Sequence, residues 1–193
     1  MRRALAPIVI AGMLAGCGIN SVPTAEENAK ARWADVQSAY QRRAGLIPNL
    51  VATAKGAAAS EREILTNVTN ARARAGSVQL SGDDLTDPAK VQQFANAQNG
   101  VSLALAQLRP LQEAYPELKS QANFTTLMQQ LESTENRIDI TVRDYNGAVQ
   151  AYNTRIRTFP DAIGAKVIHG AKPMVPFQAT TPGAEQAPTV NFG

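Results

Sequence analysis

An apolar stripe in the last third of the chain constrains the fold more strongly than any other feature. Along residues 138–159 the apolar residues follow one another in alternating steps of four and three: Ile138, Val142, Tyr145, Val149, Tyr152, Ile156 and Phe159. Such steps place side chains on one face of an α-helix. A long amphipathic helix is stable in water only when that face is covered along its length. The rest of the chain must therefore provide helices that cover it.

Two earlier segments carry stripes of the same period and can provide this cover. In residues 25–59 the stripe consists of Trp33, Val36, Tyr40, Ile47, Leu50, Ala54 and Ala57, and Arg43 occupies its one position that is not apolar. After Pro88 the stripe consists of Val91, Phe94, Gln98, Val101, Leu105 and Leu108. Pro48 lacks the donor that would bind the carbonyl of Ala44, so we expect a kink or a restart in the first helix.

Capping residues and prolines place the boundaries between the helices. Ser60 and Glu63 have capping-box spacing, which predicts a second helix that ends near Gly76, or a continuation of the first helix. A polar loop follows, and Asp87-Pro88 is typical of the start of a third helix. Tyr115-Pro116 then ends this third helix.

A fourth helix is expected from Pro116 or Glu117 to Phe159, about 60 Å at the standard rise. Because the segments have comparable lengths and matching stripes, we predict an all-α fold, an antiparallel up-and-down four-helix bundle with long helices over residues 25–160. Residues 161–193 contain four prolines and scattered glycines. We expect them to form an extended or disordered tail, laid along the bundle at Val175, Phe177, Val190 and Phe192.

The first 24 residues have the features of a bacterial lipoprotein signal. Two arginines form a positive start, and the apolar stretch after them is too short for a transmembrane helix, which needs about 20 residues. The stretch ends in Leu14-Ala15-Gly16-Cys17, which resembles the lipobox, where cleavage precedes a cysteine that then carries lipid. We therefore expect a signal peptide at residues 1–16 and a lipidated Cys17 that opens a short tether, residues 17–24. The alternative is an uncleaved membrane anchor.

The residue after the cysteine bears on which membrane holds the protein. Gly18 is not the aspartate associated with retention at the inner membrane. We therefore expect anchoring in the bacterial cell envelope at the outer membrane, facing the periplasm. The alternative is the outside face of the cytoplasmic membrane. Either way, the lipid on Cys17 makes a membrane the first expected partner.

The charge pattern does not favour a nucleic-acid partner. The formal net charge is +3, but Arg2 and Arg3 belong to the expected signal peptide, and without them 17 basic residues face 16 acidic ones. No block of five or more like charges occurs in the sequence. A phosphate-binding stripe would need such a concentration of lysine and arginine.

Residues that commonly carry catalysis are scarce in this sequence. The one histidine, His169, lies in the expected tail, and the one thiol, Cys17, is expected to be acylated. Glu132 and Glu135 have helical spacing, but di-iron bundles combine glutamate with histidine at that spacing. The sequence has no Gly-rich phosphate loop. We therefore expect neither an enzyme nor a bound metal or cofactor.

Several short motifs, taken in their order and spacing, resemble the LemA family. They are Arg42-Arg43, Leu46-Ile47-Pro48-Asn49-Leu50-Val51, Tyr115-Pro116-Glu117-Leu118-Lys119, Asn123-Phe124, Thr134-Glu135-Asn136-Arg137-Ile138, Tyr145-Asn146, Tyr152-Asn153 and Phe159-Pro160. The resemblance extends from about Asn28 to the Pro188-Thr189-Val190-Asn191-Phe192 ending. It implies a membrane-attached, exported protein with an up-and-down four-helix bundle, and it implies no particular activity. Many relatives keep an N-terminal transmembrane helix where this chain has a lipobox.

The dipeptide Tyr-Asn occurs twice, seven residues apart, at residues 145–146 and 152–153. A heptad assignment puts both tyrosines in the packed seam, as core residues or as stacking sites for a ligand. Asn146 and Asn153 fall on its flank, where a carboxamide can fix register with a neighbouring helix or belong to a polar strip that binds a partner. Arg42 and Arg43 are the other candidates for this interaction or register strip, through ion pairs between helices.

These features together predict a noncatalytic, lipid-anchored protein of the bacterial envelope. Its helical bundle would present an interaction surface to another envelope protein or to the cell wall. The alternative is a small-molecule or peptide-binding sensor module, with a cleft near Pro48 where a kink opens the bundle.

Overall fold

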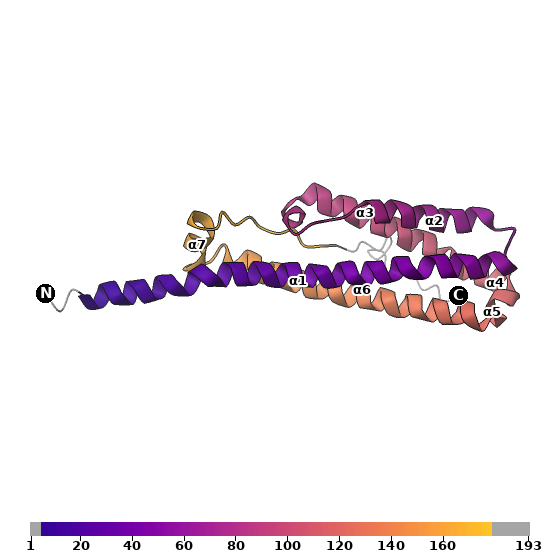
Figure 1. Cartoon of the computed structure of the whole chain (residues 1–193), viewed down its shortest axis with the longest axis horizontal. Coiled ribbons are helices and arrows are strands. Elements are labelled where there is room, and N and C mark those ends of the chain that lie inside the picture. The colour runs from indigo at the N-terminus through magenta and orange to yellow at the C-terminus, as the bar shows by residue number, and fades with distance from the viewer. Residues whose placement is uncertain (1–4, 179–193) are drawn as a thin grey trace, which may run out of the picture.

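The computed structural model describes residues 5–178, in which the long helices run alternately in opposite directions along one axis (Figure 1). In chain order the elements are α1 (Leu5–Ala57), α2 (Arg62–Ser77), the 3-10 helix η1 (Asp83–Thr86), α3 (Pro88–Ala106), α4 (Leu108–Ala114), α5 (Pro116–Ser120), α6 (Ala122–Arg155) and α7 (Asp161–Val167). No strand occurs within the described residues, and the predicted all-α class is confirmed. Nor does any helix in this part of the chain combine the length and the apolar content needed to cross a bilayer.

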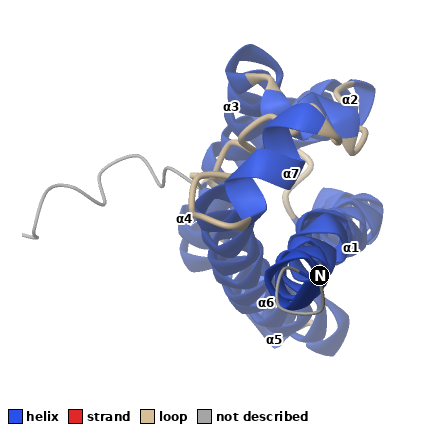
Figure 2. Cartoon of the chain, turned by 90° about the vertical axis from the view of Figure 1, so that its left-hand side faces the viewer, coloured by secondary structure: helices blue, strands red, loops and turns tan. Residues whose placement is uncertain are grey.

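α1 and α6 form the long axis of the molecule and lie side by side in both views (Figures 1 and 2). α6 buries the predicted stripe at Ile138, Val142, Tyr145, Val149 and Tyr152. Facing it, α1 buries Trp33, Val36, Tyr40, Ile47, Leu50 and Ala54. Phe159 was expected to continue the stripe, but α6 ends at Arg155 and the Phe159 side chain is 78% exposed.

α2 and α3 form a second pair that covers another side of α1 (Figure 2). α3 does not pack along α6. The extended segment 171–178, which we call the strap, enters the core between them. The ring of Phe177 lies 5.7 Å from that of Trp33 on α1 and 5.9 Å from that of Phe94 on α3, measured between centroids. The tail was expected to lie along the bundle at Val175 and Phe177, and the structure places the Phe177 side chain inside the core.

The apolar core is divided into two clusters along the long axis. The first includes Trp33, Tyr40, Phe94, Tyr145, Tyr152 and Phe177. The second includes Ile47, Leu50, Leu65, Leu105, Leu108 and Phe124. On α1 the buried Arg43 lies in sequence between Tyr40 of the first cluster and Ile47 of the second.

α1 extends beyond the expected first helix at its N-terminal side. A tether was expected over residues 17–24, but α1 continues through them, and Val22 is fully buried in the first cluster. Burial of this apolar side chain makes Val22 part of the packed body, whereas Asn20 and Thr24 beside it are exposed. Pro48 lies inside α1, and no restart occurs there. The first two helices are separate, because α1 ends at Ala57 and α2 begins at Arg62.

The capping box expected at Ser60 and Glu63 is not formed. The Ser60 hydroxyl lies 2.7 Å from the hydroxyl of Tyr115, which donates to Glu61 Oε1 at 2.8 Å. A contact with a distant residue therefore takes the serine hydroxyl that a local cap would need. The third helix, by contrast, starts at Asp87-Pro88 as predicted, and the Asp87 side chain caps it by accepting hydrogen bonds from backbone amides in the first turn.

The expected fourth helix is shorter at both ends. The chain forms the short α5, turns at Gln121, whose backbone is extended, and begins α6 at Ala122. On one straight helix, Leu118 and Phe124 would point about 120° apart. The turn lets both side chains be fully buried in the second cluster.

Up to residue 178 the expected extended or disordered tail consists of α7 and the extended strap, and the strap packs on the bundle at Val175 and Phe177 as expected. The backbone N–H of Val175 donates to the carbonyl of Leu85 in η1 at 2.8 Å, and Val175 packs against the first cluster. The prediction left disorder open because composition does not show that a few regularly spaced apolar residues can fill a gap between helices. The contacts expected at Val190 and Phe192 lie outside the described residues.

Candidate functional site

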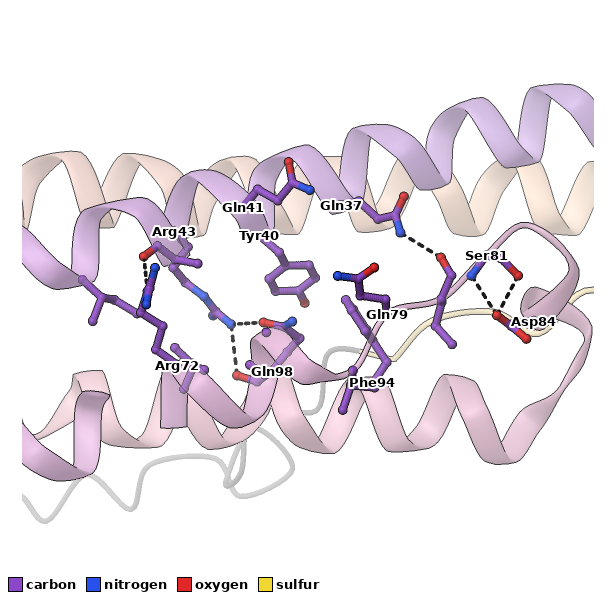
Figure 3. Close-up of a pocket in the computed structure, with 17 residues that line it drawn as sticks. Gln37, Tyr40, Gln41, Arg43, Arg72, Gln79, Ser81, Asp84, Phe94 and Gln98 are labelled. Atoms are coloured by element: carbon purple, nitrogen blue, oxygen red, sulfur yellow. Dashed lines mark hydrogen bonds between the residues drawn. The ribbon is translucent and has the colours of Figure 1, made fainter. Parts of the chain in front are cut away.

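A polar pocket of about 460 Å³ lies where α1, α2 and α3 meet the loop that follows α2 (Figure 3). We call it the arginine–glutamine pocket, because its lining includes Gln37, Gln41, Arg43, Arg72, Gln79 and Gln98. Tyr40 and Phe94 add aromatic surface to these polar groups. A concave site of this size, with apolar walls and a few fixed polar groups, is typical of small-ligand binding.

The Arg43 side chain is only 2% exposed, and both terminal nitrogens of its guanidinium donate hydrogen bonds. Nη1 donates to Ser102 Oγ at 2.9 Å and to both carboxylate oxygens of Glu135 at 3.3 Å. Nη2 donates to the backbone carbonyl of Gln98 at 3.1 Å and to Gln98 Oε1 at 2.7 Å. Figure 3 shows Arg43 and Gln98 pointing toward each other. The guanidinium also lies 4.8 Å from the centroid of the Tyr40 ring. Arg43 therefore joins α1, α3 and α6.

These contacts meet the requirements of a buried charge. An isolated guanidinium in a core would be strongly destabilising, whereas a planar fork with five donors can serve several acceptors at once. Glu135 supplies the opposite charge, and because its side chain is 39% exposed its own desolvation cost is smaller. The sequence carried a signal for this network, because Arg43 and Gln98 are the polar residues on two otherwise apolar stripes.

Arg72 of α2 compensates for the proline in α1. Pro48 has no N–H to donate to the carbonyl of Ala44, four residues earlier. Arg72 Nε donates to that carbonyl at 2.7 Å. This bond satisfies a backbone acceptor that the proline leaves without its usual donor, and it places a second guanidinium on the wall of the pocket. Sequence reasoning identified the problem at Ala44 but not Arg72, because the two residues are far apart in the chain.

The loop after α2 is held against the pocket by side-chain hydrogen bonds. Gln37 Nε2 donates to the carbonyl of Leu80 at 2.9 Å. The carboxylate of Asp84 accepts from the backbone N–H of Ser81 at 2.8 Å and from its hydroxyl at 2.7 Å, and it pairs with Lys90. The hydrogen bonds from Lys90 and then from Ser81 hold the pKa of Asp84 well below its ordinary value. Asp84 is therefore ionised at neutral pH.

The pocket offers donors and acceptors for reversible binding. Burial raises the pKa of Tyr40 to about 12, against a smaller lowering by Arg43, so the phenol is protonated at neutral pH. Among the lining residues Asp84 is the one carboxylate, and it is already paired. Within residues 5–178, no three histidine, cysteine, aspartate or glutamate side chains gather in the way a metal site requires. The chemistry of the lining suits a polar, uncharged or anionic ligand.

The two Tyr-Asn pairs of α6 bind the strap. Asn146 exchanges two hydrogen bonds with the backbone of Phe177, both at 2.8 Å. Asn153 does the same with Met174, at 2.8 and 2.9 Å. The neighbouring hydroxyls donate to strap carbonyls at 3.0 Å, Tyr145 to Val175 and Tyr152 to Lys172.

The spacing of these pairs matches the spacing of the strap. Seven residues of α-helix rise about 10.5 Å, and three residues of extended chain span about 10 Å. Met174 and Phe177 are three residues apart, so each meets an asparagine on α6. Pro173 and Pro176 precede them, at positions where neither Tyr-Asn pair needs a backbone donor. The same contact therefore occurs twice: each Tyr-Asn pair of α6 binds one Pro-containing tripeptide of the strap, Lys172-Pro173-Met174 or Val175-Pro176-Phe177.

The structure separates residues that the sequence interpretation grouped as one strip. Asn146 and Asn153 fix a register, but with the strap and not with a neighbouring helix. Arg43 is buried in the network above, whereas Arg42 is exposed. The backbone of Cys17 lies in α1, five residues before the buried Val22.

Comparison of the sequence with known proteins shows which family this chain resembles. Residues 32–192 match the model of the LemA family. The chain is 29% identical over 157 residues to magnetosome protein MamQ 2 of Paramagnetospirillum magneticum, covering 73% of this chain and 58% of that protein. It is 24% identical over 124 residues to protein LemA of Metamycoplasma hominis, covering 64% of this chain and 52% of that protein. The chain therefore spans little more than half the length of these relatives.

Proposed function

This chain belongs to the LemA family, and from that premise we propose that it is a lipid-anchored, noncatalytic protein of the bacterial envelope. Its helical body presents an interaction surface to another envelope protein or to the cell wall. The favoured location is the outer membrane, facing the periplasm, with the outside face of the cytoplasmic membrane as the alternative. The observation that carries the proposal is the place of Cys17. It follows a lipobox-like sequence and lies on the same continuous helix that runs through the packed body.

A groove between α3, α4 and α6 supports a surface for a basic partner. It has a volume of about 1110 Å³, and we call it the acidic groove because its lining carries the carboxylates of Glu113, Glu132, Glu135 and Asp139 and one arginine, Arg109. Glu135 is paired with the buried Arg43, so three carboxylates remain to face Arg109 and a partner. Opposite charges across an interface speed encounter and select partners. A basic segment of another envelope protein fits this chemistry.

The anchor is tested by lipid labelling in cells. With Cys17→Ala we expect incorporation of labelled fatty acid to be lost and the chain to keep residues 1–16. Circular dichroism of the purified variant serves as the control for folding. Unchanged labelling of Cys17→Ala would remove the anchor from the proposal.

The interaction surface is tested by photo-crosslinking in intact cells. A photoreactive amino acid at Gln129, an exposed residue of the acidic groove, should give a discrete crosslinked protein band. The same amino acid at Ser38, an exposed residue of α1 that does not line the groove, is the matched control. A band of equal strength at both positions, or at neither, would contradict the assignment of the groove.

The arginine–glutamine pocket favours a second candidate function, a sensor for a small polar ligand or peptide. The pocket is lined by residues of α1 just before Pro48, close to where sequence reasoning expected a cleft. A ligand that binds the folded state raises the melting temperature by mass action. We expect cell-wall fragments to raise the Tm of the native chain and to lose this effect in Gln41→Leu, which removes a polar group from the lining. A Tm increase that persists in Gln41→Leu would place binding elsewhere.

A further inference from the structure

Large apolar side chains are exposed together around α7. Four of them lie within ten residues: Phe159, Ile163, Val167 and Ile168, with 78, 59, 77 and 58% exposure. Among the residues whose burial the structure describes, the other two exposed large apolar side chains, Leu103 and Ile140, stand singly on α3 and α6. Scattered exposed apolar residues are normal, but a contiguous group indicates a contact surface.

α7 has one face toward the body and one face away from it. Ala165 is 2% exposed and belongs to the first core cluster. Ile163 and Val167 are four residues apart and therefore share a face, and that face is opposite to Ala165 on a helix of 3.6 residues per turn. The packed side of α7 is thus accounted for, and the apolar outer side faces solvent.

Basic residues surround this apolar group. From Arg155 to Lys172, with both ends included, the chain has four lysine or arginine residues and one acidic residue, Asp161. Arg157 and Lys166 are exposed within that stretch. Apolar side chains flanked by lysine and arginine are the pattern of a surface that rests at the interface of an anionic bilayer. An anionic bilayer attracts the basic flank and covers the apolar side chains in one contact.

The position of α7 is next to the proposed lipid attachment. α7 packs on α1 near the end where α1 projects from the body (Figure 1). Arg155 Nη1 donates to the carbonyl of Ser21 on α1 at 3.2 Å. Cys17 precedes Ser21 by four residues, about 6 Å along a helix. The apolar group and Cys17 therefore belong to the same end of the molecule.

We propose that α7 with Phe159 and Ile168, which we call the α7 foot, is a second membrane contact that lies in the headgroup region of an anionic bilayer. This inference rests on the proposed function for what brings the chain to the membrane. The foot and the acyl chains together hold the body in one orientation, since two separated contacts remove the rotation that one flexible lipid tether allows. The acidic groove then keeps a constant direction relative to the bilayer.

The test measures lipid contact at single positions of the full chain. The chain is reconstituted into vesicles of phosphatidylcholine and phosphatidylglycerol with a benzophenone amino acid in place of Val167. After illumination we expect a lipid adduct by mass spectrometry. The same amino acid in place of Leu103 or Ile140 is the matched control, because both side chains are apolar and about half exposed. We expect adduct yields there to be at least several-fold lower.

The outcomes separate the foot from the anchor. No adduct at Val167, or equal yields at Val167 and Ile140, overturns the foot whether or not Cys17 carries lipid. An adduct at Val167 that persists in Cys17→Ala supports the foot even where lipid labelling has contradicted the anchor. Vesicles of phosphatidylcholine alone should lower the yield at Val167 several-fold, and an unchanged yield would contradict a contact with anionic lipid.

Discussion

At the scale of single residues, the polar interruptions of apolar stripes mark contacts between helices. Arg43 interrupts the apolar stripe of α1, and Gln98 interrupts the apolar stripe of α3. In the folded protein the Arg43 guanidinium donates hydrogen bonds to Gln98. Glu135 balances the charge from α6. A buried guanidinium is tolerated only with such partners, so the polar residue on the α1 stripe needs the polar residue on the α3 stripe. The neighbouring Arg42 has no such role, although the sequence gives both arginines the same motif.

Arg43→Ala is expected to lower the free energy of unfolding by about 3 kcal/mol, because two buried acceptors of Gln98 lose their donor and each such loss costs about 1–3 kcal/mol. Arg42→Ala, the matched control, should stay within about 0.5 kcal/mol of the native chain, as is usual for exposed residues. Urea unfolding followed by circular dichroism measures both values. If both substitutions change the free energy of unfolding equally, the hydrogen-bond network of Arg43 does not contribute to stability.

At the scale of elements, α1 crosses Pro48 because α2 supplies a donor from outside the helix. The interaction of Arg72 with the Ala44 carbonyl is a tertiary contact that maintains a secondary structure. Local rules predicted a kink or a restart, because they consider only the donor that proline lacks, and of these two the restart does not occur. The helix continues where packing brings another donor to the same carbonyl.

A double-mutant cycle tests this compensation. Arg72→Ala should lower the free energy of unfolding by about 1–2 kcal/mol in the native background. In the Pro48→Ala background the N–H of residue 48 can bind the Ala44 carbonyl again, and the cost of Arg72→Ala should fall by about 1 kcal/mol. Additive effects of the two substitutions would mean that Arg72 does not act through this carbonyl.

The strap is an element of the core although it is neither helix nor strand. Its backbone groups are bonded to side chains of α6, and Met174 and Phe177 are buried. Extended chain that is not in a sheet needs such partners, because buried backbone donors and acceptors are rarely left without one. The two asparagines therefore satisfy backbone groups of the strap, as the hydrogen bonds of a neighbouring strand do in a β-sheet.

Hydrogen exchange should report the loss of these partners. In a chain with both Asn146→Ala and Asn153→Ala, we expect the amides of Met174 and Phe177 to exchange at least tenfold faster, since each loses its acceptor. The amides of α6 should keep their protection. Asn136→Ala, an exposed asparagine on the same helix, is the control and should leave strap exchange unchanged. If these two amides exchange at the same rate in the double variant, the asparagines do not hold the strap in place.

At the scale of the whole molecule, buried phenols in the first core cluster link stability to pH. Burial raises the pKa of Tyr40 to about 12 and raises the pKa values of Tyr145 and Tyr152 above their ordinary value. A raised pKa in the folded state means that the unfolded chain loses the proton first. The stability from these phenols is complete below pH 10, the ordinary value, and it is lost as pH rises above it.

We therefore expect the free energy of unfolding to fall above pH 10, with up to about 1.4 kcal/mol per pH unit for each tyrosine. Urea unfolding at a series of alkaline pH values measures this slope. Tyr145→Phe should be less stable at neutral pH, because the hydrogen bond to Val175 is lost, but its slope above pH 10 should be shallower. A slope that does not change in Tyr145→Phe would show that this phenol is not linked to folding.

The sequence by itself determined the helical class and the faces that helices bury. The steps of four and three that begin at Ile138 correspond to buried side chains as far as Tyr152, because helical periodicity is a local property of the chain. The start of α3 at Asp87 follows from a local cap for the same reason. The LemA resemblance, read from motif order, is confirmed over residues 32–192.

Only the tertiary structure decided which distant groups meet. Arg72 reaches the Ala44 carbonyl, Arg43 reaches Gln98, and the Tyr-Asn pairs of α6 bind the strap, and none of these partners is adjacent in sequence. Whether a side chain bonds to water, to its own helix or to a distant backbone depends on which elements pack around it. Sequence periodicity shows which face of a helix is buried, but the identity of the covering group is a property of the folded arrangement.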